Sequence, residues 1–90
     1  MSELDLLRRA IDALDEQMVA LFSKRMDISG QIGLIKRREG LPTLDESREQ
    51  QVIERAVSLA DEQLAPQIAE LMALIMRMSK ETQGNTIGHI

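Results

Sequence analysis

Residues 4–35 read LDLLRRAIDALDEQMVALFSKRMDISGQIGLI and carry one apolar pattern with a single interruption. The apolar residues recur at alternating spacings of three and four, at Leu4, Leu7, Ile11, Leu14, Met18 and Leu21 and again at Ile28, Ile32 and Ile35. This spacing is typical of the seam of a coiled-coil-like helix, and no proline interrupts it. The pattern therefore predicts one long helix, in which Arg25 occupies the seam position after Leu21.

The predicted helix is longer than a compact domain of 90 residues is wide. At a rise of ~1.5 Å per residue it extends on the order of 50 Å, whereas a compact chain of this size is roughly 25 Å across. The helix must therefore project beyond its own domain or lie against another chain. Because its seam can be buried in full only by a second chain, we expect an obligate dimer.

Two further helices are predicted after the segment REGLPTLDESRE, residues 38–49. Gly40 can end the first helix, Pro42 cannot continue it, and Thr43 with Glu46 fits a capping box that opens the second. The inward side of the second helix carries Val52, Ile53, Ala56, Leu59 and Ala60. A turn near residues 64–66 leads into the third, whose apolar face is Ile68, Leu71, Met72, Ile75 and Met76. The expected fold is all-α, with a long, a short and a medium helix in residues 1–83 and a disordered tail at residues 84–90.

Composition argues against several classes of protein. The chain has no Cys, and its single His, His89, is the penultimate residue, so neither a metal site nor a disulfide framework is expected. The formal net charge is −4 and no aromatic residues lie among the basic ones, which argues against nucleic-acid binding. No apolar run is long enough for a signal peptide or a membrane span, so we expect a cytoplasmic protein without membrane association.

Polar residues occupy inward positions on the first predicted helix. Lys36 follows Arg25 by eleven residues, which returns to within about 20° of the same helix direction. Ser29 and Ile32 lie between them on that face. A cationic strip therefore lies where this helix should pack.

The other two predicted helices also become polar on their inward sides. The apolar stripe of the third helix continues into Ser79 and Gln83. On the second helix, Arg48 and Glu49 lie one turn before its first inward apolar residues, with Asp45 beside them. Singly, each residue has a structural explanation: a seam Arg can set register, a Lys can complement the helix dipole, and the others can be solvated.

Taken together, three helices that become polar on inward faces favour a pocket inside a bundle. Its cations, with an amide, a hydroxyl and a carboxylate, suit a small dicarboxylate held by guanidinium groups. Since the candidate residues include no Cys, His or metal-binding motif, an enzyme built on them would act by orientation and electrostatics, not by covalent chemistry.

The segments LLRRAIDALDEQMVALFSKR, GLIKRREGLPTLDESRE and SKETQ resemble the all-helical chorismate mutases. The resemblance extends over about residues 4–83. It implies an intertwined homodimer of three-helix chains with shared active sites. It also implies the Claisen rearrangement of chorismate to prephenate in aromatic amino-acid biosynthesis, a step without a cofactor.

The resemblance further implies roles for individual residues. Arg25 binds one carboxylate of chorismate with help from Ser79, while Arg8 of the other protomer holds the second carboxylate. Lys36 contacts that second carboxylate and the ether oxygen, to which Gln83 also forms a hydrogen bond.

The remaining roles implied by the family concern the ring of the substrate and the pocket walls. Glu49 accepts a hydrogen bond from the ring hydroxyl, supported by Asp45, and Arg48 adds positive potential. Ile32 and Val52 form apolar walls.

Two alternatives to a mutase remain at this point. An isochorismate-pyruvate lyase resembles these mutases and has a similarly cationic pocket, although Glu49 directly after Arg48 favours the mutase. A helical dimerisation module would instead pair Arg25 and Lys36 with carboxylates of a partner helix. Incubation with chorismate distinguishes the three, since they yield prephenate, pyruvate or no product.

Overall fold

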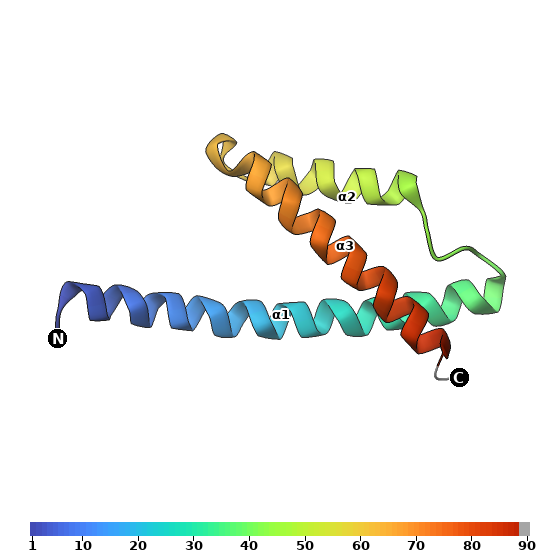
Figure 1. Cartoon of the computed structure of the whole chain (residues 1–90), viewed down its shortest axis with the longest axis horizontal. Helices are drawn as coiled ribbons and strands as arrows, with labels where there is room; N and C mark the ends of the chain where they lie inside the picture. Colours follow the sequence, from blue (N-terminus) through green and yellow to red (C-terminus); the bar gives the residue numbers. More distant parts are fainter. Residues whose placement is uncertain (89–90) are drawn as a thin grey trace.

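Three α-helices and one short 3₁₀ turn make up the described part of the chain (Figure 1). The structure, a computed structural model, describes residues 1–88, with side chains through residue 84. The helices are α1 (Glu3–Glu39), α2 (Glu46–Leu59) and α3 (Ala65–Gly88), and the turn η1 (Glu62–Leu64) precedes α3. This confirms the predicted all-α chain with a long, a short and a medium helix. Among the described helices, none combines the length and the apolar character needed to cross a membrane.

Both ends of α1 satisfy their free backbone groups locally. At the start, the side chain of Ser2 accepts a hydrogen bond from the Asp5 N–H at 3.1 Å. At the end, Gly40 adopts a φ of 69°, and the N–H groups of Gly40 and Leu41 donate to carbonyl oxygens of the last turn. These two bonds form a Schellman motif, so Gly40 ends the first helix as predicted.

Gly40→Ala is expected to lower the free energy of unfolding by about 1 kcal/mol, because an L side chain is disfavoured at positive φ. No neighbouring atom lies within 4 Å of the added Cβ, so the effect is conformational and not steric. The matched control is Gly84→Ala, which also meets open space but lies within α3, where Ala is favoured over Gly. Urea unfolding at one fixed protein concentration measures both, and a Gly40→Ala midpoint at or above that of wild type would contradict the expectation.

The start of α2 is determined by Asp45. Its carboxylate accepts a hydrogen bond from the Arg48 N–H at 3.0 Å, and a negative charge at this end also complements the helix dipole. The predicted capping box of Thr43 and Glu46 is therefore wrong. Thr43 lies in the preceding loop, where its carbonyl oxygen accepts a hydrogen bond from Lys36 Nζ at 2.7 Å.

The helix that holds the chain together is α3. It contacts both α1 and α2, whereas α1 and α2 scarcely touch each other. In Figure 1 it runs diagonally from the end of α2 to the last turns of α1. The C-terminal part of α3 is consequently the place where residues of all three helices meet.

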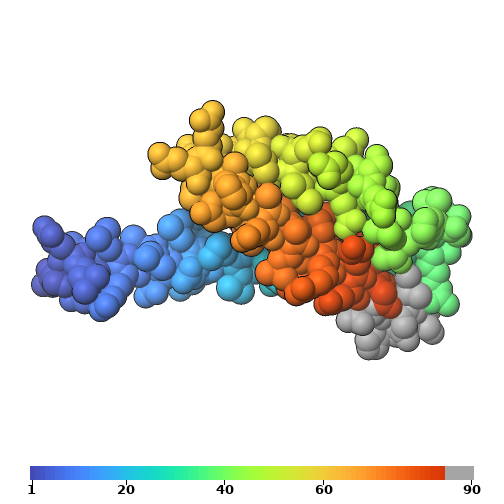
Figure 2. All heavy atoms as spheres, turned by 45° about the horizontal axis from the view of Figure 1, so that its top comes forward, coloured from blue at the N-terminus to red at the C-terminus, as the bar shows by residue number. Residues whose placement is uncertain are grey.

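Little apolar surface is buried within the single chain. All side chains of residues 1–24 are exposed, and Figure 2 shows the N-terminal part of α1 projecting from the remaining helices. The predicted seam is uncovered along its length: Leu7 and Leu21 are each 64% exposed, and Ile32 is 42% exposed. The radius of gyration is 16.5 Å, whereas a compact chain of this length has about 12 Å.

The ends of α2 and α3 differ from two expectations. Leu59, predicted to face inward, is the last residue of α2 and is 77% exposed, because the chain turns away there. The predicted tail, residues 84–90, begins within the last turns of α3. His89 lies outside the described residues, and the domain boundary at residue 83 stays a prediction.

Candidate active site

A pocket of about 420 Å³ opens between the C-terminal half of α1, the start of α2 and the end of α3. Its lining residues are Arg25, Ile28, Ser29, Ile32, Lys36, Thr43, Asp45, Arg48, Glu49, Val52, Met76, Ser79, Lys80 and Gln83. The most buried polar side chains among the described residues belong to it: Ser29, Ser79 and Gln83, with 5%, 6% and 7% exposure. Buried polar groups need hydrogen-bond partners, so a concave site lined by them is typical of ligand binding.

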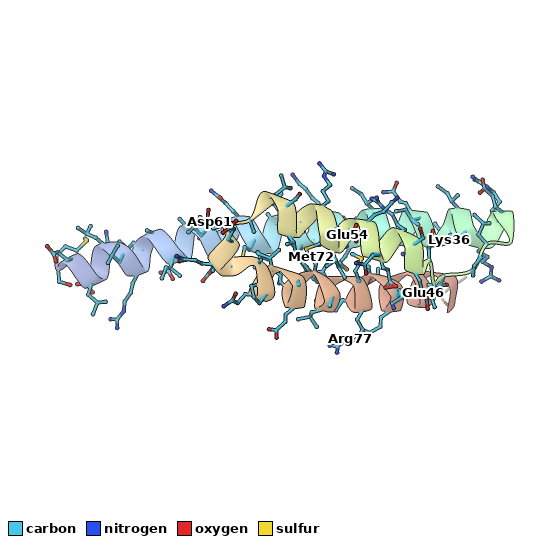
Figure 3. The ribbon with its side chains drawn as sticks, turned by 90° about the horizontal axis from the view of Figure 1, so that it is seen from above. Lys36, Glu46, Glu54, Asp61, Met72 and Arg77 are labelled. Carbon is cyan, nitrogen blue, oxygen red and sulfur yellow. The ribbon has the colours of Figure 1, made fainter. Side chains whose placement is uncertain are left out.

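The contribution of α1 comes from one helix face. Arg25, Ser29, Ile32 and Lys36 follow one another at spacings of four, three and four residues, and all four line the pocket. In Figure 3, Lys36 lies at the same end of the molecule as Glu46, the first residue of α2. The cationic strip predicted from the sequence therefore faces the junction of the three helices.

Arg25 is half-buried, and its guanidinium donates to the Ser79 hydroxyl at 2.6 Å. Burial lowers the pKa of the Arg25 guanidinium below its ordinary value, and the positive charge of Arg48 lowers it further. No carboxylate among the described residues forms an ion pair with Arg25. A bound anion would offset both effects, so this part of the pocket favours a negatively charged ligand.

Lys36 and Gln83 meet where α1 crosses α3. Lys36 Nζ donates to Gln83 Oε1 at 3.2 Å and to the Thr43 carbonyl oxygen at 2.7 Å. Because the amide oxygen of Gln83 already accepts from Lys36, its amide N–H groups are left to donate to a ligand. The pocket thus has an ammonium and an amide donor side by side.

The wall formed by α2 is tied to α3 by an ion pair. Lys80 Nζ lies 3.0 Å from Glu49 Oε1, and both residues line the pocket. Since both side chains are partly exposed, the pair adds at most about 1 kcal/mol to stability. Its main consequence is positional, because it holds the Glu49 carboxylate against the pocket while the second oxygen can accept a hydrogen bond.

The pocket has a surplus of positive charge. Its cationic side chains are Arg25, Lys36, Arg48 and Lys80, and its carboxylates are Asp45 and Glu49, which leaves two uncompensated positive charges. Apolar side chains line the rest, namely Ile28, Ile32, Val52 and Met76. This combination suits a small, partly apolar molecule with two negative charges.

Most of the residues predicted for the site lie together in this pocket. They are Arg25, Ile32, Lys36, Asp45, Arg48, Glu49, Val52, Ser79 and Gln83. The exception is Arg8, an exposed residue of α1 seventeen positions before Arg25, which corresponds to about 25 Å along the helix. Within one chain, Arg8 is not part of this pocket.

The pocket is also lined by residues for which no site role was predicted, namely Ile28, Ser29, Thr43, Met76 and Lys80. Helical spacing placed Ser29 on the polar face of the first helix without giving it a role. The same spacing could have found Lys80, which lies one turn before Gln83. Thr43 takes part through its carbonyl oxygen, which every residue type has. No sequence signal marks such a contribution.

The fold and the site together define an all-helical protein whose cationic pocket, at a three-helix junction, suits a small dianion. Among known families, the model of chorismate mutase type II matches residues 7–84, which include every residue of the pocket and Arg8. The chain belongs to the chorismate mutase type II family.

Individual relatives agree with this assignment. The intracellular chorismate mutase of Mycolicibacterium smegmatis is 35% identical over 82 residues, which cover 91% of this chain and 75% of that protein. The bifunctional chorismate mutase/prephenate dehydratase of Escherichia coli is 35% identical over 86% of this chain and 20% of its own length. A solved structure, a conserved hypothetical protein from Pyrococcus furiosus, has a TM-score of 0.78 at 35% identity and covers 92% of this chain and 97% of that one.

These matches confirm the resemblance to the all-helical chorismate mutases. The activity is therefore that of an isomerase, which converts chorismate to prephenate in aromatic amino-acid biosynthesis.

Proposed function

We propose that this chorismate mutase works as a homodimer in which each active site combines the pocket of one chain with the partner subunit's Arg8. The observation that carries the dimer is the exposed apolar seam of α1. The half-buried Arg25, in a pocket with two uncompensated positive charges, supports chorismate as the ligand. Chorismate has two carboxylates, and a partly buried site for a dianion needs cations that are not already neutralised by the protein.

A second copy of α1 is the surface that fits the apolar seam. The seam of residues 4–35 is exposed in the single chain, and monomers rarely expose an apolar stripe of this length. A helix with the same alternating spacing can cover it throughout. Two-fold symmetry would then bring the N-terminal half of each α1 to the pocket of the other chain.

This arrangement gives Arg8 a role that it cannot have within its own chain. About 25 Å of helix separates Arg8 from Arg25, which is further than two side chains can span to one small substrate. If both residues bind chorismate, they must therefore serve different pockets. The partner subunit's Arg8 also adds a further cation to each site.

In the proposed complex, Arg25 binds one carboxylate of chorismate through its guanidinium fork. The hydrogen bond to Ser79 holds that guanidinium in place. Lys36 and the partner subunit's Arg8 bind the second carboxylate. The two ends of the substrate are thereby fixed, which favours the folded conformation in which its reacting carbons meet.

Lys36 and Gln83 act on the ether oxygen of the substrate. The rearrangement breaks the carbon–oxygen bond and forms a carbon–carbon bond within one molecule, while negative charge builds on the ether oxygen. Donors directed at this oxygen bind the transition state more tightly than the ground state, which lowers the barrier. The contact between Lys36 and the amide of Gln83 supports this assignment, since it brings both donors to one place.

The wall opposite these donors positions the ring. Glu49 accepts a hydrogen bond from the ring hydroxyl, with its carboxylate held by Lys80. Asp45 supports it from the start of α2, and Arg48 contributes positive potential. Ile32 and Val52 contact the apolar faces of the ring.

The dimer is tested by sedimentation equilibrium of the purified chain. We expect a species of twice the sequence mass of 10.1 kDa across micromolar concentrations, since the exposed seam is long enough for an obligate interface. A control variant, Arg77→Ala, changes an exposed residue of α3 and should leave the mass unchanged. A folded and active species of monomer mass would overturn the proposal.

Turnover of chorismate tests the proposed chemistry of the site. Loss of chorismate absorbance in the ultraviolet should be accompanied by prephenate in equal amount. A parallel incubation with isochorismate tests for a lyase, which would release pyruvate. The absence of turnover of either compound by a folded dimer would indicate a dimerisation module.

We also propose a cytoplasmic location. It is supported by the relatives from Mycolicibacterium smegmatis and Mycobacterium tuberculosis, which are both named intracellular chorismate mutases. Fractionation of cells that produce the natural protein would test it.

A further inference from the structure

Gly33 lies where α1 packs tightly against α3. It is buried, and a Cβ atom built on it would lie 2.9 Å from Gln83 Cα and 3.1 Å from both Gln83 Cβ and Gln83 O. Ordinary contacts of a Cβ atom begin at about 3.4 Å. The two helices can therefore cross at this separation only because residue 33 has no side chain.

The atoms that a side chain would meet belong mainly to the backbone of Gln83. A flexible side-chain end could turn aside, but backbone atoms inside α3 can move only with the helix. Lys36 lies one turn after Gly33 on the same helix and donates to the Gln83 amide at 3.2 Å. The crossing at Gly33 and the contact between the two proposed donors thus involve the same residue of α3.

We infer that Gly33 is a positioning residue for catalysis. Because it has no side chain, α3 can pack close against α1, which places the Gln83 amide beside Lys36 and the reacting oxygen. This inference rests on the proposed role of Gln83 as a donor to the ether oxygen. A methyl group at residue 33 forces α3 outward by roughly 0.5 to 1 Å, and a misplacement of about 1 Å can cost on the order of 100-fold in rate.

The first experiment compares Gly33→Ala with Gly84→Ala. Both replace a helical glycine by alanine, but the added methyl meets Gln83 at residue 33 and open space at residue 84. We expect Gly33→Ala to lower kcat by roughly 30- to 100-fold with a much smaller change in KM, because the displaced amide acts mainly in the transition state. Gly84→Ala should keep the kcat of wild type. A folded Gly33→Ala enzyme with unchanged kcat would overturn the inference.

The second experiment asks whether Gly33 acts through Gln83. The Gly33→Ala change is introduced into Gln83→Ala, in which the crossing keeps a Cβ atom on α3 but the amide is gone. If Gly33 acts by positioning the amide, adding Gly33→Ala to Gln83→Ala should lower kcat further by less than about threefold. A loss as large as that in the wild-type background would show a general structural effect and contradict a positioning role.

The same set of variants distinguishes failure of this inference from failure of the proposed role of Gln83. Unchanged kcat in Gln83→Ala would remove Gln83 from the chemistry. A large loss in Gln83→Ala with no loss in Gly33→Ala would leave that role intact and refute only the positioning by Gly33.

If circular dichroism shows that Gly33→Ala does not fold, a last variant, Gln83→Asn, still tests the inference. Gln83→Asn adds no atom at the crossing and draws the amide back by about one bond length, ~1.5 Å. We expect a loss in kcat on the order of 100-fold, as for the displaced helix. Unchanged kcat would show that the amide tolerates such a shift, and would overturn the inference.

Discussion

In Gln83→Glu, kcat/KM at neutral pH should fall by roughly 100-fold or more and recover as the pH is lowered. A carboxyl group at this position can donate to the ether oxygen only when it is protonated. Its ionised form would oppose the negative charge that develops there. Because Lys36 lies within hydrogen-bond distance of this side chain and favours the ionised form, recovery requires a pH well below neutral.

The measurement is kcat/KM against pH for wild type and variant, over the range in which both remain folded by circular dichroism. Gln63→Glu is the matched control, because it introduces the same carboxyl group at an exposed residue of η1 outside the pocket. Its profile should follow that of wild type. A Gln83→Glu profile parallel to wild type would show that Gln83 does not donate to the reacting oxygen.

Arg8→Ala and Arg25→Ala should each lose on the order of 1000-fold in kcat/KM, since each removes a cation that binds a substrate carboxylate. When the two inactive proteins are mixed and allowed to exchange chains, activity should return. Each heterodimer then contains one site with both arginines and one with neither. Random exchange in equal amounts should restore about a quarter of wild-type activity, because half of the dimers are mixed.

The control for this experiment is Arg9→Ala, which removes an exposed arginine next to Arg8 on α1. We expect it to stay active on its own. Native mass spectrometry establishes that heterodimers have formed. If they form without a return of activity, the two arginines do not serve sites shared between chains.

The sequence predicted the helices well because their spacing and their end signals are local properties. The seam of residues 4–35 predicted α1, and Gly40 ends it as expected. The start of α2 was placed wrongly because Thr43 and Asp45 are both good capping residues, and their types alone do not distinguish them. The structure shows that Asp45 is the residue that caps α2, because its carboxylate accepts a hydrogen bond from the Arg48 N–H. The Thr43 carbonyl oxygen instead accepts a hydrogen bond from Lys36.

The candidate site was predictable where a polar residue interrupts an apolar stripe. Arg25, Ser79 and Gln83 all stand at helical positions where an apolar residue is the default. The contributions that were missed depend on tertiary structure. The ion pair of Lys80 with Glu49 and the close approach of Gly33 to Gln83 arise only from the angle and depth at which α3 crosses its neighbours.

The N-terminal half of α1 also has a consequence for how the molecule forms. Residues 1–24 are exposed throughout in the single chain, so their helix has only local interactions to stabilise it there. Helices that rely on such interactions alone are marginal in water. We therefore expect the ordering of this segment and its coverage by another surface to be one coupled event.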